Sequence, residues 1–242
     1  MIAVFLLDPI AQDPKYYEFA DDRTILKLPN FWNVVSNVAF FLVGGAGLFY
    51  LRSKNRPGVH PDMHVAYVIF FAGVFLTGIG STYFHYAPGN NTLVWDRLPM
   101  TIGFMALFAI IISEYISLRV AKRMLFPLLI IGAASVVYWG VTEARGGGDL
   151  RPYAVIQFLP MLLIPLILLM YRSVYDKTGF LWIVVALYVL SKLFEQVDLA
   201  VFETGGLISG HSVKHIVAAL APLVFLYGLD IRRPENDESL AR

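Results

Sequence analysis

Seven long apolar runs divide the chain and limit its fold more than any other feature of the sequence. Each run is close to the roughly 20 residues that a helix needs to cross a bilayer. Only helices or closed barrels satisfy their backbone groups within lipid, and these runs are too long and continuous for barrel strands. We therefore predict an all-α fold, a seven-helix transmembrane bundle. The predicted spans are Trp32–Leu51, His64–His85, Leu93–Glu114, Met124–Thr142, Ala154–Tyr171, Phe180–Val201 and Gly210–Leu229.

The composition also indicates a membrane protein. Of the 242 residues, 57% are hydrophobic and only 15% are charged, against roughly 25% charged in an average soluble domain. The net charge of +1 gives no indication of nucleic acid or of an acidic partner, and no obligate protein partner is apparent. The chain has no Cys, which excludes disulfides and thiolate metal sites.

Polar segments flank the predicted bundle. Residues 1–30 form a polar N-terminal arm, residues 31–230 the seven-transmembrane domain and residues 231–242 a polar tail. The first residues, "MIAVFLLDPIAQD", contain a very short apolar run with no basic segment before it, so we do not expect a cleaved signal peptide. No internal repeat or second domain is visible.

Lys and Arg gather in alternate loops, which predicts the orientation of the bundle. One side would carry Arg52, Lys54, Arg56, Arg119, Lys122, Arg123, Arg172, Lys177, Arg232, Arg233 and Arg242. The other side would carry the smaller set Lys15, Arg23, Lys27, Arg145 and Arg151. Basic loops favour the cytoplasm, so we predict a multi-pass protein with an extracytoplasmic N-terminus and a cytoplasmic C-terminus.

Polar residues interrupt the apolar chain at one predicted depth. The stretch "GSTYFHYAPGNNTLVWDRLPM", residues 80–100, contains Ser81, His85 and Asp96, and "GHSVKH" begins the last span. With the predicted topology, all of these residues lie near the outer side. Ionisable residues within a membrane are costly and are functional candidates by default.

The spacing of the histidines indicates a metal site. His211 and His215 are four residues apart, so a helix presents both on one face. His85 is the obvious third ligand at the same depth. Three histidines with an open fourth position are a ligand set of catalytic zinc.

Neighbouring residues supply the remaining groups that hydrolysis needs. Bound zinc makes hydroxide available at neutral pH, and a carboxylate such as Asp96 could take the proton of the water and deliver it to the leaving group. Ser81 lies four residues before His85 and could donate a hydrogen bond to an oxyanion. Asp198 and Glu195 are candidate partners for the ligand histidines.

Each feature also has a purely structural explanation. His-x3-His pairs are common, and Ser81 could serve close helix packing. Asp96 followed by Arg97 could be an interfacial ion pair beside Trp95. Gly44, Gly45 and Gly47 predict close contact between helices. The coincidence of several ionisable residues at one depth favours the functional interpretation.

The chain resembles the alkaline ceramidases, which belong to a superfamily of seven-helix membrane hydrolases that includes the adiponectin receptors. The resemblance rests on "NFWNVV", "SNVAFFLVG", "GSTYFH", "WDRLPM" and "GHSVKHIVAAL", in that order, from about Asn30 to Ala219. Ser-x3-His, the following Asp and the final His-x3-His are specific in combination. The resemblance implies a buried zinc within a seven-helix bundle and hydrolysis of the ceramide amide to a sphingoid base and a fatty acid.

The resemblance also implies the role of individual residues. The zinc ligands fall on His85, His211 and His215, the water-activating acid on Asp96 and the oxyanion-stabilising hydroxyl on Ser81. Asp198 resembles a further Asp of the family in helix six.

The sequence departs from the family at two positions. Eukaryotic members bind calcium through an acidic arm and a Glu before "FWN", where this chain has Asn30. Oxygen ligands for calcium could still come from Glu18, Asp21, Asp22 and Asn30. The alternative is a solvated arm with Asn30 as a helix N-cap. Arg97 stands where ceramidases usually have an acidic residue, which affects the expected substrate contacts.

The function expected from these observations is that of a zinc-dependent intramembrane amidase acting on a ceramide-like lipid in the bilayer. Hydrolysis of another acyl lipid is one alternative. Another is a lipid-binding receptor or sensor with the same fold and a structural zinc. A transporter that uses His and Asp as a proton relay is a third, but it would favour repeat halves or broken helices, and neither is visible in the sequence.

Overall fold

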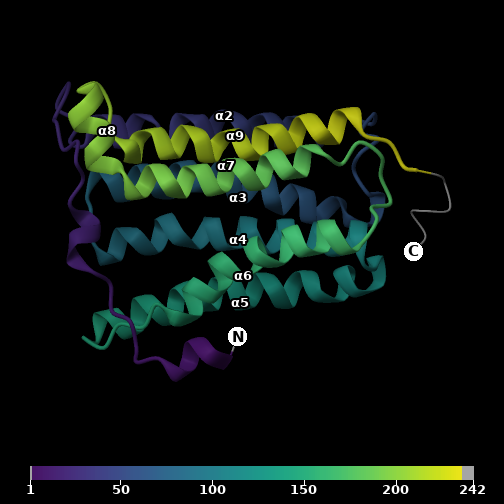
Figure 1. The fold of residues 1–242 in the computed structure, drawn as a ribbon, viewed down its shortest axis with the longest axis horizontal. Helices are drawn as coiled ribbons and strands as arrows, with labels where there is room; N and C mark the ends of the chain where they lie inside the picture. The colour runs from purple at the N-terminus through teal and green to yellow at the C-terminus, as the bar shows by residue number, and fades with distance from the viewer. Residues whose placement is uncertain (1, 236–242) are drawn as a thin grey trace.

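The computed structural model describes residues 2–235 and folds them into helices joined by short connections (Figure 1). The α-helices are α1 (Phe31–Val35), α2 (Val38–Tyr50), α3 (His64–Tyr86), α4 (Asn90–Tyr115), α5 (Leu118–Ala144), α6 (Arg151–Met170), α7 (Phe180–Gln196), α8 (Asp198–Gly205) and α9 (Gly210–Ile231). Short 3-10 helices span Ile2–Leu6, Pro14–Tyr17 and Pro61–Met63. No β-strand forms within residues 2–235, so the predicted all-α class is confirmed. Residues 236–242 of the predicted tail lie outside the described part.

The lengths of the helices fit a membrane-spanning bundle. Six stretches are long and apolar enough to cross a bilayer, and α7 with α8 makes a seventh if the bent pair is one span. The six are Phe31–Tyr50, Pro61–Tyr86, Asn90–Tyr115, Leu118–Ala144, Arg151–Met170 and Gly210–Ile231. The chain is therefore a multi-pass membrane protein.

The prediction of one continuous helix over Phe180–Val201 is wrong. α7 ends at Gln196, and α8 bends away from it by 75° across one end of the bundle (Figure 1). The carboxylate of Asp198, the first residue of α8, accepts backbone N–H groups from Ala20 at 3.1 Å and from His211 at 2.7 Å. These bonds join the start of α8 to the N-terminal arm and to α9, which favours the bend.

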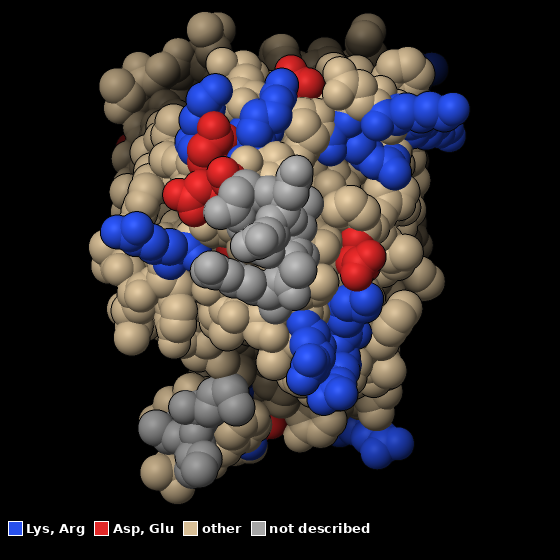
Figure 2. Space-filling view, turned by 90° about the vertical axis from the view of Figure 1, so that its right-hand side faces the viewer, with Lys and Arg blue, Asp and Glu red and all other residues tan. Residues whose placement is uncertain are grey.

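The long helices lie side by side, so the connections gather at two ends (Figure 1). We call them the arm end (residues 8–30, 87–89, 145–150 and 197–209) and the tail end (residues 51–60, 116–117, 171–179 and 232–235). Figure 2 shows the tail end, where many Lys and Arg side chains cover the surface. Described basic residues that the sequence assigned to one side therefore lie at one end of the fold, while the orientation itself stays a prediction.

Close glycine contacts bring the first three spans together. A Cβ atom on Gly44 would overlap the backbone of Phe75, and one on Gly47 would overlap the ring of Phe71. These contacts confirm the close approach predicted for those two glycines. A Cβ atom on Gly80 of α3 would overlap the carbonyl group of Trp95 in α4. α3 and α4 therefore approach each other closely within the polar stretch of residues 80–100.

Candidate metal centre and active site

Three buried histidines meet near the arm end of the bundle. α3 contributes His85 in its last turn, and α9 contributes His211 and His215 from its first two turns. One ring nitrogen of each histidine lies within 4.8 Å of those of the other two. Among the described residues, this is the only group of three or more His, Cys, Asp or Glu side chains that could hold one metal ion. The predicted convergence of the three rings is therefore observed.

The spacing of two nitrogens of the triad fits a tetrahedral metal ion. The Nε2 atoms of His85 and His211 are 3.3 Å apart, and two nitrogens bound tetrahedrally at about 2.0–2.1 Å from one ion stand roughly 3.3–3.4 Å apart. The Nδ1 atom of His85 is buried without a hydrogen-bond partner. Three imidazole nitrogens form a donor set suited to zinc and to other borderline metal ions. These residues could hold one such ion.

A chain of hydrogen bonds fixes the ring of His215. Its Nδ1 atom lies 2.8 Å from Oγ of Ser36, and that hydroxyl donates to the backbone carbonyl of Asn33 at 3.2 Å. Because Ser36 already uses its hydrogen on that carbonyl, His215 is the donor in the first bond. This tautomer leaves Nε2 of His215 free to bind a metal. A partner of this kind orients a ligand histidine and raises its basicity.

Asp96 and Ser81 face each other beside the triad. Asp96 lies in the second turn of α4 and Ser81 lies one turn before His85 in α3, and both side chains are buried. The close approach at Gly80 brings these parts of α3 and α4 together. The two predicted catalytic side chains therefore lie together on the wall of one cavity.

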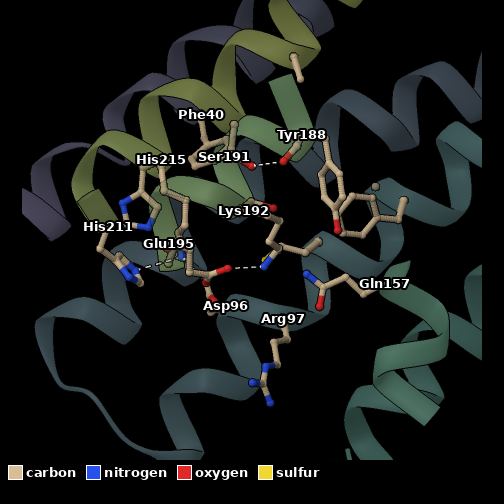
Figure 3. A pocket seen from close by; sticks show the side chains of 18 of the residues that line it. Phe40, Asp96, Arg97, Gln157, Tyr188, Ser191, Lys192, Glu195, His211 and His215 are labelled. Atoms are coloured by element: carbon tan, nitrogen blue, oxygen red, sulfur yellow. Dashed lines mark hydrogen bonds and ion pairs between the residues drawn. The ribbon is translucent and has the colours of Figure 1, made fainter. Parts of the chain in front are cut away.

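A cavity of about 910 Å³ joins these side chains to the interior of the bundle. It is within the size range of small-molecule sites. Its deeper wall is apolar and is formed by Phe70, Val74, Leu107, Met161, Val184 and Pro222. Its polar groups gather at the arm end, where Figure 3 shows Asp96 and Glu195 beside the histidines of α9. The shape and chemistry suit a molecule with one polar end and an acyl chain.

The N-terminal arm covers the outer side of the triad. The ring of Phe19 lies 4.7 Å from the ring of His85 and 5.0 Å from that of His211, measured between centroids. Tyr16 is half-buried in the same part of the arm, and burial, followed by the charge of Glu195, raises the pKa of its phenol well above the ordinary value. The arm therefore shields the metal centre from the solvent at this end.

Asp96 and Arg97 do not form the interfacial ion pair considered as an alternative, so that interpretation is wrong. No ion pair joins them among the described residues. The guanidinium carbon of Arg97 stacks 4.3 Å from the ring centre of Trp139, and its Nη2 atom donates to the side chain of Gln12 at 2.7 Å. In Figure 3, Arg97 points away from the histidines and Glu195. Arg97 thus anchors the arm to the bundle.

The two predicted partners of the histidines act in ways that the sequence did not specify. Asp198 accepts from the backbone N–H of His211, which caps the start of α9 and does not involve the imidazole ring. Glu195 binds the ammonium of Lys214 at 2.9 Å, and that ammonium lies 3.1 Å from Nε2 of His211. Glu195 therefore binds Lys214, and it is Lys214 that contacts the triad.

The four candidate calcium ligands do not gather in this structure. Both carboxylate oxygens of Asp21 bind the guanidinium of Arg23 at 2.7 Å. The amide nitrogen of Asn30 donates to the backbone carbonyl of His85 at 2.9 Å and makes no cap bond to α1. Glu18 and Asp22 do not join Asp21 in any ligand cluster within residues 2–235. Calcium binding stays a prediction that this arrangement does not support.

Comparison with known families gives one match. A model of the ceramidase family matches residues 27–239, which is most of the chain. The chain belongs to the ceramidase family. A search of curated proteins returned no match. Membership of the ceramidase family implies hydrolysis of the ceramide amide and a lipid substrate, and it confirms the resemblance found in the motifs.

Sequence reasoning missed three residues at this site. Ser36, Lys192 and Lys214 all contact the triad or its neighbours. Each carried a signal, because polar and charged residues within a membrane span are functional candidates. The spacing alone could not reveal Ser36, since its contact with His215 joins the first and last spans.

Proposed function

We propose that this protein is a metal-dependent intramembrane amidase that hydrolyses ceramide-like lipids to a sphingoid base and a fatty acid. The observation that carries the proposal is that one largely apolar cavity is lined by the three histidines of the triad, Asp96 and Ser81. The ceramidase family match supports the same reaction. Zinc is the metal that the histidine donor set favours most.

The lipid would enter the cavity with its acyl chain along the apolar wall and its amide beside the triad. Zinc bound to His85, His211 and His215 would supply Lewis-acid activation of water and of the amide carbonyl. The apolar wall excludes other water from the reacting groups.

Asp96 is proposed to move the proton. Its carboxylate takes a proton from water while the water oxygen bonds to the carbonyl carbon, and the π electrons of the C=O bond move to its oxygen. Ser81 donates a hydrogen bond to that oxygen. When the electrons return, the C–N bond breaks and the nitrogen takes the proton from Asp96. Water and amide are converted to a fatty acid and an amine.

The purified protein should be incubated with a panel of ceramides, other N-acyl lipids and ester lipids, with and without a chelator, and the products identified by mass. The proposal predicts chelator-sensitive release of fatty acid and sphingoid base from at least one ceramide. Release from ester lipids alone would replace the amidase assignment with an esterase. Bound zinc without release from any lipid would favour a receptor or sensor.

The arm end is proposed to face away from the cytoplasm, since basic side chains gather at the tail end (Figure 2). A protease added to intact cells should then cut the arm and leave the tail uncut. Cutting of the tail alone would invert the orientation and move the site to the inner leaflet.

A further inference from the structure

Lys214 is a buried cation directly beside the metal centre. It lies in α9 between His211 and His215, and its side chain is only 16% exposed. Its Nζ atom lies 3.1 Å from Nε2 of His211 and 2.9 Å from Oε1 of Glu195. Lys192 of α7 binds the other oxygen of the same carboxylate at 2.5 Å, as Figure 3 shows. Two cations therefore share one anion at the polar end of the cavity.

The hydrogen-bond donors of Lys214 are not all satisfied once a metal is bound. An ammonium has three N–H donors, and this one has two acceptors, Glu195 and Nε2 of His211. A metal ion bound to that nitrogen uses the lone pair that now accepts from Lys214. The ammonium then keeps a single acceptor and has free donors beside the site of reaction.

Few acceptors for the free donors of Lys214 are found among the described residues of the pocket. The carboxylate of Asp198 already accepts two backbone N–H groups. Arg97 is itself a donor: its Nη2 atom binds Gln12 and its guanidinium stacks on Trp139, while its Nη1 atom is buried without a hydrogen-bond partner. A buried charge without sufficient partners is costly. A ligand oxygen that carries negative charge would supply the missing partner of Lys214.

We propose that Lys214 is the anion-binding residue of this site. Its ammonium takes the substrate oxygen that becomes negative: the carbonyl oxygen during hydrolysis and then the carboxylate of the fatty acid. This inference rests on the proposed amidase function for its catalytic part. Lys192 and Glu195 hold the ammonium in place, and the ion pair with Glu195 prevents it from leaving the cavity.

The proposal predicts different effects on substrate binding and on turnover. The carbonyl oxygen of a bound ceramide is neutral, so Lys214 contributes little to KM. Its charge acts once the oxyanion forms, and loss of a single oxyanion donor typically lowers kcat about 10²–10³-fold. Lys214→Met should therefore lower kcat in this range while leaving KM nearly unchanged.

The direct test measures ligand binding without turnover. Purified protein with its metal bound is titrated with palmitic acid and separately with hexadecanol, because the donors of Lys214 are free only when a metal occupies Nε2 of His211. A charge-assisted hydrogen bond is lost in Lys214→Met, so palmitic acid should bind roughly ten- to a hundredfold more weakly. Hexadecanol binding should not change. Lys214→Gln carries the same test if the Met variant cannot be purified.

Lys122→Met is the control, because Lys122 is a lysine in a surface ion pair with Asp62 and does not line the cavity. Its palmitic acid affinity should stay within about threefold of the parent. Equal losses in both variants would overturn the assignment of Lys214, since any positive charge would then suffice. Unchanged palmitic acid affinity in Lys214→Met would overturn it as well.

Failure of this inference can be distinguished from failure of the proposed function. If the parent hydrolyses no ceramide but loses palmitic acid binding in Lys214→Met, the amidase function fails and the anion site stands. If the parent hydrolyses ceramide and Lys214→Met binds palmitic acid as the parent does, the anion site fails and the amidase function stands.

Discussion

The arm end and the tail end both bury charged residues, but they use them differently. At the tail end, Glu114 and Arg232 are completely buried and pair at 2.5 and 2.8 Å, with the hydroxyl of Tyr67 donating to the same carboxylate. The carbonyl of Gly58 accepts two further bonds from Arg232. At the arm end, Asp96, Glu195 and Lys214 line a cavity. The tail-end pair is fully enclosed, whereas the charged groups of the arm end border a cavity that a ligand could enter.

The tail-end pair also shows how strongly such enclosure favours the charged state. Burial by itself would lower the pKa of Arg232, but the charge of Glu114 outweighs burial and raises that pKa above its ordinary value. The guanidinium therefore stays charged at every pH at which the protein is folded. We expect changes at the tail end to affect stability, and changes at the arm end to affect metal binding and turnover.

The largest effect should follow removal of a metal ligand. His211→Ala leaves two histidines, so nearly all bound zinc should be lost, and turnover should fall by more than the roughly 10⁴-fold upper range of general acid–base assistance. Elemental analysis and product mass measure the two quantities. His64→Ala is the control, because His64 contacts Arg56 and the Leu51 carbonyl outside the triad. Full zinc retention in His211→Ala would contradict the ligand assignment.

Asp96→Asn should give the next largest effect. The amide keeps the shape of the side chain but cannot accept the proton of water, so turnover should fall about 10²–10⁴-fold with most zinc retained. Turnover and zinc should be measured in the same preparation. Asp62→Asn, an exposed change in a surface ion pair with Lys122, should leave both unchanged. If Asp96→Asn were as fast as the parent, Asp96 would have no part in proton transfer.

Arg232→Met should lower stability and leave turnover unchanged. It leaves Glu114 buried without its cation, and an uncompensated buried charge typically costs about 3–5 kcal/mol of stability. Thermal or denaturant unfolding measures the loss, and turnover per folded molecule should equal that of the parent. The double variant Glu114→Gln, Arg232→Met should be more stable than the single one. A single variant as stable as the parent would remove the structural role of the pair.

Ser36→Ala should have the smallest effect of the four. The ring of His215 loses the hydroxyl that orients it, and loss of such a partner typically weakens metal affinity about 10–100-fold. Competition with a chelator of known affinity measures this change. Ser113→Ala is the control, because Ser113 is a buried serine that bonds the carbonyl of Ile110 in α4. Equal zinc affinity in the two variants would exclude a positioning role for Ser36.

The sequence predicted the helical spans and the His211–His215 pair because both depend on local periodicity, and it predicted His85 from its depth in the topology. A run of apolar residues specifies a span, and a spacing of four brings His211 and His215 to one face of a helix. The break between α7 and α8 was missed because it depends on distant partners of Asp198, namely Ala20 and His211. The surroundings of Arg97 were missed for the same reason, since Gln12 and Trp139 come from other segments. Tertiary contacts decide these features, and one sequence does not contain them.

Metal reconstitution is the most direct test of metal-dependent amide hydrolysis at the arm end. Protein stripped by a chelator is titrated with zinc, and ceramide turnover and bound zinc are measured at each addition. We expect no turnover in the stripped protein, and turnover that rises linearly with bound zinc up to about one zinc ion per chain. Full turnover in the stripped protein, or recovery that does not follow zinc uptake, would contradict a metal-dependent amidase at the arm end.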